Sequence, residues 1–203
     1  MTTETEVETL LRDPFRRPDE SPRPLGPVEL ADALNASLLV PQLDSLAEMA
    51  APYRDLAPFE AARQLMSRVY RDFEYEPGVT DVTTSVAHVL EGRRGVCQGF
   101  AHLLIGLCRA LALPARYVSG YILTGDQTSD PSRGGGASHA WAEVFTPSHG
   151  WRGFDPTNNL VANDRYVKIA TGRDYHDVPP TRGTYHGASP GKLVVSVVTR
   201  PLD

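Results

Sequence analysis

The stretch that decides the fold is Gly92-Arg-Arg-Gly-Val-Cys-Gln-Gly-Phe-Ala-His-Leu-Leu-Ile-Gly-Leu-Cys-Arg-Ala-Leu-Ala-Leu-Pro114. Glycines at 92 and 95 interrupt the chain ahead of it, a dense apolar run extends from Cys97 to Leu113, and Pro114 closes the run. An apolar run of this length, with glycine before it and proline after it, is typical of a mostly buried helix. We therefore predict a central helix that begins at Cys97 and runs towards Leu113.

The chain changes character from one side of this helix to the other. Upstream, apolar residues recur at three- and four-residue spacing between Pro58 and Pro77, which predicts a helix. Shorter helices are expected over 43–51 and 82–91. Downstream, several segments are typical of strands, namely 115–123, 140–145, 151–154, 165–169 and 193–199. Helices followed by strands indicate the α+β class with an antiparallel sheet.

The N-terminal region differs in composition from the rest of the chain. Residues 1–28 hold five prolines among charged residues, a pattern typical of poorly ordered chain. The 203 residues are enough for one domain with its own core. We predict a flexible Pro-rich lead-in over 1–30 and one domain over 31–203.

The charge balance restricts the possible partners. The net charge is −5, from 20 Lys and Arg against 25 Asp and Glu, without a dense basic cluster. This argues against nucleic acid or an anionic membrane as a partner. No apolar run reaches the roughly 18 residues of a membrane span, and residues 1–11 lack the basic start and apolar core of a secretory signal. We expect a cytoplasmic location; the oligomeric state is not indicated.

The chain has only two cysteines, Cys97 and Cys108, which is too few for a disulfide framework. On one helix they would lie about 16 Å apart at about 1.5 Å per residue. A disulfide requires less than roughly 7 Å between the Cα atoms, so both are expected to be free thiols. No close Cys and His pairing or acidic calcium loop is present, and we expect no metal and no cofactor.

Cys97 is the candidate nucleophile. A thiol in the first turn of a helix lies at the positive end of the helix dipole, close to unpaired backbone N–H groups, and both favour the thiolate. Gly95 and Gly99 leave space for a substrate to approach. The alternative, that Cys97 is a small buried core residue, stays open at this point. Cys108, deep in the same apolar run, is expected to be core.

The segment 138–155 has the pattern of a β-hairpin with a polar five-residue loop at 146–150. Antiparallel pairing around that loop places Glu143 opposite Gly153. Because side chains alternate between the two faces of a strand, His139 and Asp155 then share one face. They become diagonal neighbours about 7–8 Å apart along the backbone, within reach of a side-chain hydrogen bond.

These three residue types form a coherent set of catalytic groups. A Cys97 thiolate would attack an amide carbonyl, and His139 would pass a proton to the leaving amine. Asp155 would hold the imidazole tautomer and stabilise the imidazolium. The backbone N–H of Cys97 could bind the developing oxyanion; the second donor is not identified. Trp141 or Trp151 could cover the site or serve only as packing.

Several ordered blocks resemble the bacterial transglutaminase-like family. They are Gly95-Val-Cys-Gln-Gly-Phe-Ala-His102, Leu113-Pro-Ala-Arg-Tyr-Val-Ser-Gly-Tyr121, Ser138-His-Ala-Trp-Ala-Glu-Val144 and Gly150-Trp-Arg-Gly-Phe-Asp-Pro-Thr-Asn158. With shorter matches at 172–175 and 177–180, the resemblance covers roughly 35–200. It implies a papain-like α+β core with the nucleophile helix packed on an antiparallel sheet. It also implies Cys97 as nucleophile, His139 as base and Asp155 as orienting acid.

Two departures from that family stand out. Many relatives carry an acidic residue where this chain has Gly99, and relatives often have a β-rich segment ahead of the core. A contact with the substrate or at the helix start could therefore differ. Neither departure touches the three candidate residues.

The remaining candidates receive structural roles. His102 lies about 140° around the helix from Cys97 and is expected to make a core hydrogen bond. The histidines 88, 149, 176 and 186 are isolated and are expected on the surface or in packing. The glycines 134–136 suggest a flexible loop or, alternatively, a gating lid. The segment 173–175 is either a substrate-contacting loop or a structural turn.

The sequence therefore predicts thiol-dependent acyl transfer at an amide of a protein or peptide. Hydrolysis as a cysteine peptidase or amidase and transfer to an amine as a transglutaminase share the acyl-enzyme step, and the residues do not separate them. Hydrolysis is favoured slightly, because water needs no acceptor pocket; peptide-bond formation on a small amine is a third possibility. The alternative of a different class is a non-catalytic peptide-binding module with the same fold.

Overall fold

The helix expected from the opening stretch is the centre of the molecule. The computed structural model describes residues 4–77, 84–123, 138–179 and 197–200. Helix α5 (Cys97–Ala110) begins where predicted, and all its residues from Gly99 to Cys108 are buried. It ends at Ala110, three residues earlier than expected, because the chain turns at Ala112, whose φ is +57°, ahead of Pro114.

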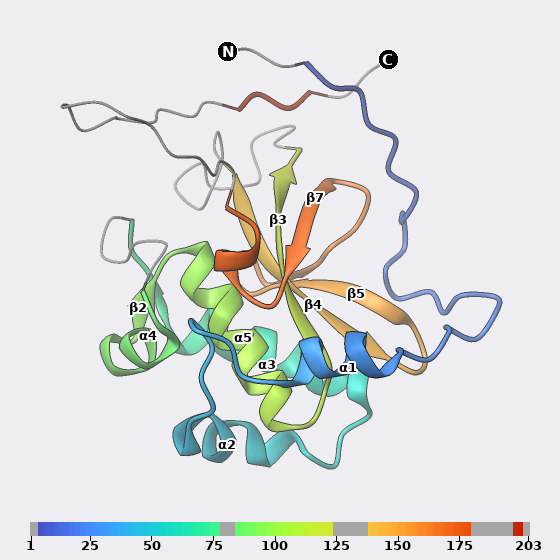
Figure 1. The fold of residues 1–203 in the computed structure, drawn as a ribbon. Coiled ribbons are helices and arrows are strands. Elements are labelled where there is room, and N and C mark those ends of the chain that lie inside the picture. The colour runs from blue at the N-terminus through green and yellow to red at the C-terminus, as the bar shows by residue number, and fades with distance from the viewer. Residues whose placement is uncertain (1–3, 78–83, 124–137, 180–196, 201–203) are drawn as a thin grey trace.

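Four further α-helices surround α5 on one side of the sheet (Figure 1). They are α1 (Pro27–Leu34), α2 (Asp44–Ala50), α3 (Pro58–Asp72) and α4 (Val86–Gly92), with the short 3₁₀ turn η1 (Ala51–Tyr53) after α2. The predictions of α2, α3 and α4 are confirmed, although α4 begins four residues later than expected. Helix α1 was not predicted, because it begins at a proline within the Pro-rich region. Proline is well suited to a first helical position.

The strands form one antiparallel sheet of five, in the order β6-β5-β4-β3-β7. Its members are β3 (Ala115–Ile122), β4 (His139–Thr146), β5 (Gly150–Asp155), β6 (Leu160–Val161) and β7 (Tyr166–Gly172). The predicted α+β class with an antiparallel sheet is confirmed. A separate parallel pair, β1 (Glu74–Tyr75) and β2 (Arg94–Gly95), lies just ahead of α5. The expected strand at 193–199 lies mostly outside the described residues, and its described part, 197–199, is not a strand.

The two faces of the sheet bury different sets of residues. Ala140, Ala142, Val144 and Phe154 belong to the main core with α5. The opposite face carries a smaller apolar cluster of Val118, Trp141, Ala162 and Tyr166. Burying one large apolar side chain stabilises the fold by about 1.5–3 kcal/mol, so the main core supplies most of the driving force. The smaller cluster lies on the same face as the residues considered next.

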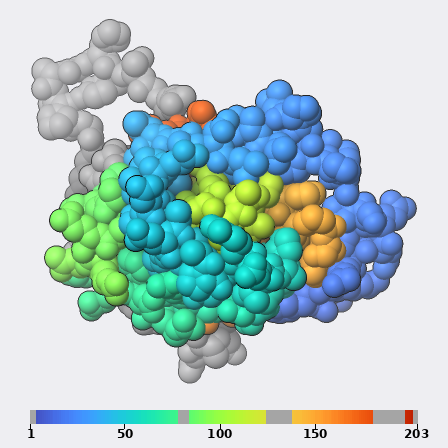
Figure 2. Space-filling model, turned by 90° about the horizontal axis from the view of Figure 1, so that it is seen from below, coloured from blue at the N-terminus to red at the C-terminus, as the bar shows by residue number. Residues whose placement is uncertain are grey.

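The described part of the N-terminal segment, residues 4–26, forms no helix or strand and lies against the β4–β5 hairpin. The Arg152 guanidinium donates to the carbonyls of Pro14 and Arg16 at 3.1 and 3.2 Å. The His149 ring meets the Phe15 carbonyl at 3.2 Å. Viewed from below, the blue N-terminal chain borders the orange hairpin (Figure 2). The division into a lead-in and a domain stays a prediction, to which the structure adds these contacts.

Candidate active site

Cys97 is the first residue of α5, as predicted. The preceding Val96 is extended and caps the helix, so the backbone N–H groups of the first turn have no intrahelical partner. The thiol is nearly enclosed, at 5% exposure, and donates to the Gln98 side-chain oxygen at 3.5 Å. A nucleophile placed here lies beside backbone donors that can bind an oxyanion.

The position of the helix start depends on close packing just ahead of it. Strand β2 pairs with β1, and the Glu76 N–H donates to the Gly95 carbonyl at 3.0 Å. A Cβ on Gly99 would lie 3.0 Å from a methyl carbon of Val89 on α4. The glycine therefore allows α4 to pack tightly against the first turn of α5. This is a structural reason for the glycine at this position.

The hairpin register is confirmed. Glu143 lies opposite Gly153, as predicted. The pairing continues one step further than expected, since Thr146 pairs with Gly150. The loop is therefore 147–149 and not the five residues expected. This shortening leaves the register unchanged, because both strands lengthen by one residue.

This register brings His139 and Asp155 together. The imidazole Nε2 lies 2.9 Å from Asp155 Oδ2, and both side chains are fully buried. Because a carboxylate only accepts, Nε2 carries the proton and donates. Nδ1 is then the free nitrogen; it is buried and has no hydrogen-bond partner among the described residues. Cys97 is among the groups that raise the pKa of His139, which places the thiol close to the ring.

The electrostatics of this pair favour an imidazolium next to a carboxylate. Burial alone would lower the pKa of His139, but the charge and hydrogen bond of Asp155 outweigh it and raise this pKa well above its usual range. Burial alone would likewise raise the pKa of Asp155, yet the imidazolium charge and the hydrogen bonds to the carboxylate lower it. The site can therefore hold a proton on His139 next to Cys97.

Two residues that the sequence analysis missed hold the carboxylate of Asp155. Asn158 donates its side-chain amide to Oδ2 at 2.7 Å, and the backbone N–H groups of Thr157 and Asn158 donate to Oδ1 at 2.9 and 3.3 Å. The Tyr166 hydroxyl donates to Oδ2 at 2.8 Å. The Asp-Pro-Thr-Asn sequence carries a signal for the first set, since Asp side chains commonly accept from the N–H two residues on. Nothing in the sequence points to Tyr166, which comes from β7.

Comparison with known proteins places this geometry in a family. Residues 47–156 match the model of the transglutaminase-like superfamily, a range that includes Cys97, His139 and Asp155. The chain belongs to that superfamily. An uncharacterized protein of Mycobacterium tuberculosis is 42% identical over 200 residues, which are 94% of this chain and 64% of the relative. An uncharacterized Mycobacterium leprae protein is 40% identical over 69% of this chain and 48% of its own length.

Solved structures agree on the fold of this transglutaminase-like chain. The "Putative Cysteine Protease" of Cytophaga hutchinsonii superimposes with a TM-score of 0.62 at 32% identity, covering 76% of this chain and 50% of that one. The periplasmic domain of TgpA from Pseudomonas aeruginosa gives a TM-score of 0.50 at 23% identity, covering 66% and 49%. The fold is therefore a papain-like transglutaminase core. The chain spans less than two thirds of the length of the mycobacterial relatives.

Trp141 packs beside the candidate triad. Its ring lies nearly parallel to that of His139, with centroids 6.1 Å apart, and it is only 2% exposed. A Cβ on Gly120 or Gly153 would collide with the indole, so both glycines make room for it. Trp151 serves as packing elsewhere, under the Arg116 guanidinium at 4.0 Å. Of the two tryptophans, Trp141 is thus the one that contacts the site.

The structure separates other candidates of the transglutaminase-like chain from the triad. The Tyr175 N–H donates to His102 Nε2 at 3.1 Å, which confirms the expected core hydrogen bond. Cys108 is fully buried and both cysteines are free, as predicted. Asp174 is buried and accepts from the Leu39 N–H at 3.0 Å, so 173–175 forms a structural turn. The glycines 134–136 lie outside the described residues.

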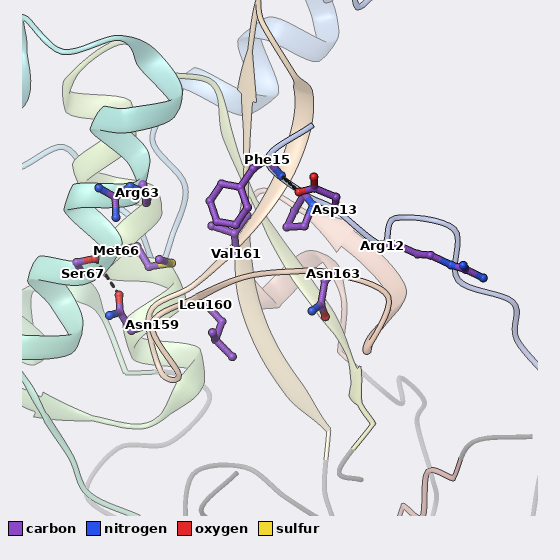
Figure 3. A pocket seen from close by; sticks show the side chains of 11 residues that line it. Arg12, Asp13, Phe15, Arg63, Met66, Ser67, Asn159, Leu160, Val161 and Asn163 are labelled. Carbon is purple, nitrogen blue, oxygen red and sulfur yellow. Dashed lines mark hydrogen bonds between the residues drawn. The ribbon is translucent and has the colours of Figure 1, made fainter. Parts of the chain in front are cut away.

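A pocket of about 410 Å³ opens near β6, whose Leu160 lines it (Figure 3). The N-terminal segment, α3 and the chain around β6 line it, with Phe15, Met66 and Val161 among the residues drawn. None of the three candidate residues contributes to its lining. The pocket therefore plays no part in assigning the chemistry.

None of the helices in the described residues combines the length and apolar character needed to span a membrane. In the same part of the chain, no three or more His, Cys, Asp and Glu side chains come together as a metal site would require.

Proposed function

We propose that this protein is a thiol enzyme that transfers acyl groups at amide bonds of a protein or peptide. Cys97 is the nucleophile, His139 the general base and acid, and Asp155 the group that orients His139. The observation that carries the proposal is the placement of His139. Its Nε2 is bound to a buried carboxylate, and its free Nδ1 lies beside a thiol at a helix start.

The first half-reaction follows from this arrangement. The Cys97 proton passes to His139 Nδ1, and the thiolate sulfur forms a bond to the amide carbonyl carbon. The carbonyl oxygen takes up the negative charge beside the backbone N–H groups at the start of α5. When the C–N bond breaks, the proton on Nδ1 moves to the leaving amine, and a thioester on Cys97 remains.

The acceptor of the acyl group decides between two subclasses. Water gives a carboxylic acid and an amidase or peptidase, whereas an amine gives a new amide and a transglutaminase. We propose hydrolysis first, because water needs no dedicated acceptor pocket. The name of the Cytophaga hutchinsonii neighbour also points to a protease. Transfer to an amine is the alternative within the same chemistry.

A peptide-binding module without catalysis is the second candidate function. It is favoured by the enclosure of Cys97, whose thiol donates to Gln98 rather than to His139. Against it stands the set of donors on Asp155, because a binding surface does not require a buried, oriented carboxylate next to a histidine. Catalysis is therefore our first proposal.

Site-resolved iodoacetamide alkylation against pH, read by mass spectrometry, tests the first proposal. Cys108 is the internal control, because it is fully buried and burial raises its pKa to about 12. We expect His139→Ala to lower the alkylation rate of Cys97 at neutral pH by at least about 10²-fold, because the imidazolium that would stabilise its thiolate is lost. The low rate of Cys108 should stay unchanged. A Cys97 rate that is the same in the wild type and in His139→Ala would favour the binding module.

We further propose a cytoplasmic location, in which the two free thiols would stay reduced. The proposed substrate is a protein or peptide, and neither nucleic acid nor a membrane is a proposed partner, in keeping with the net charge of −5. Cell fractionation with an antibody against the protein tests the location. Recovery outside the cytoplasmic fraction would contradict it.

A further inference from the structure

Oδ2 of Asp155 accepts three hydrogen bonds from side chains. His139 Nε2 donates at 2.9 Å, the Asn158 amide at 2.7 Å and the Tyr166 hydroxyl at 2.8 Å. The carboxylate is fully buried, so these donors and the two backbone N–H groups on Oδ1 take the place of water. A buried carboxylate stays ionised only when such donors are present.

Tyr166 is fixed in place by its surroundings. It belongs to β7 and pairs with Ile122 of β3. Its ring meets that of Trp141 edge-on, with centroids 5.3 Å apart at 78°. Burial and then the charge of Asp155 raise its pKa, so the hydroxyl keeps its proton and donates at all working pH values. Tyr166 therefore supplies a neutral, directed donor to the carboxylate.

We infer that Tyr166 is a positioning residue of the proposed reaction. Its hydroxyl keeps the Asp155 carboxylate ionised and directed at His139, and thereby sets the lower pH limit at which Cys97 reacts. The residue lies beyond position 156, where the match to the family model ends. The expected effect of Tyr166 on Cys97 rests on the proposed function. Its expected effect on the hydrogen bond between Asp155 and His139 does not.

The charged and titratable groups around this contact are few. His139 and Tyr166 face the carboxylate of Asp155, and Cys97 adjoins His139. Arg165, next to Tyr166, lowers the pKa of the Tyr166 hydroxyl, against the effect of Asp155. Its guanidinium donates to the Leu123 carbonyl at 3.0 Å. Loss of the hydroxyl therefore removes a donor from Oδ2 that no neighbouring charge replaces.

The variant Tyr166→Phe tests the inference, since it keeps the ring on Trp141 and removes only the hydroxyl. Loss of one donor disfavours the carboxylate, so Asp155 takes up a proton at higher pH. We expect the lower limit of the alkylation profile of Cys97 to move up by about 0.5–1 pH unit. Tyr121→Phe is the matched control, because Tyr121 lies on the neighbouring β3 and is not among the donors to Asp155. It should leave the profile unchanged.

A second readout does not depend on Cys97. The Nε2–H proton of His139 is observed by NMR of the ¹⁵N-labelled protein. With one donor fewer, Oδ2 becomes a stronger acceptor, so this resonance should move downfield in Tyr166→Phe and stay in place in Tyr121→Phe. A resonance and a pH profile that both match the wild type would overturn the role of Tyr166. A resonance that moves, together with a Cys97 alkylation rate that His139→Ala leaves unchanged, would overturn the proposed function and support the contact.

Discussion

The two ends of α5 carry the same side chain in different surroundings. Cys97 and Cys108 are both buried, at 5% and 0% exposure. Cys97 stands at the helix start beside His139, whereas Cys108 lies in the apolar core, where burial raises the pKa of its thiol to about 12. Burial alone therefore does not distinguish a candidate nucleophile from a core residue.

The difference between the two thiols arises from the groups that surround each end of α5. At the N-terminal end, the backbone N–H groups of the first turn and an imidazole held by Asp155 can stabilise negative charge. At the Cys108 end, the charge of Arg109 lowers the pKa of the thiol, and burial outweighs this effect. One end of the helix is thus suited to chemistry, and the other to stability. Three predictions test this division.

The largest expected effect is on reactivity at the Cys97 end. Asp155→Asn replaces the carboxylate that stabilises the imidazolium by a neutral amide. We expect the alkylation rate of Cys97 at neutral pH to fall by about 10²–10⁴-fold, while that of Cys108 stays at its low value. Mass spectrometry of both thiols in one sample measures the ratio, with circular dichroism as the folding control. An unchanged ratio in a folded variant would show that Asp155 has no part in activating Cys97.

The second effect is on stability and should fall on the opposite end. Cys108→Ser places a hydroxyl in the apolar core and should lower the free energy of unfolding by about 1–3 kcal/mol. Cys97→Ser should lower it by less than Cys108→Ser does, because the hydroxyl can donate to Gln98 as the thiol does. Urea titrations of both variants provide the comparison. Equal losses would contradict the division of roles.

The third prediction compares two of the buried histidines, His102 and His139. Burial lowers the pKa of His102 to about 4, although Asp174 opposes it. The unfolded chain then binds a proton that the folded one does not, so stability should fall as the pH drops from about 6.5 to 4, by about 1 kcal/mol per pH unit. His102→Asn should remove that slope.

For His139 the dependence of stability on pH has the opposite sign. Its pKa is raised, against the effect of burial, to about 10 by Asp155 and Cys97. In Cys97→Ser, where no thiol can supply this proton, the folded protein holds a proton that the unfolded chain has lost. Stability is then complete below about pH 6.5 and should fall between about 6.5 and 10. Urea midpoints measured across both pH ranges, in the wild type, in Cys97→Ser and in the double variant Cys97→Ser with His139→Gln, check the slopes. A flat profile above neutral pH would contradict the ion pair with Asp155.

Much of the fold follows from local pattern. The starts of α2, α3 and α5 lie within one residue of the expected positions, because proline and apolar spacing mark them. Helix α1 was not predicted, because a proline usually interrupts a helix. The short strand β6 was not predicted, because two residues are too few for a periodic pattern. The hairpin register was predictable, since alternation leaves one choice that buries Ala140, Ala142 and Val144.

The sequence by itself determined a central helix with a thiol at its start and a hairpin with a histidine and an aspartate on one face. Those features follow from glycine, proline and the two periodicities, which act over a few residues. Only the tertiary structure decided which groups hold Asp155, how His139 lies beside Cys97 and why Cys108 is inert. Tyr166 reaches the carboxylate from the start of β7, although β4 and β3 lie between β5 and β7 in the sheet order. A contact of that kind depends on the packing of whole strands.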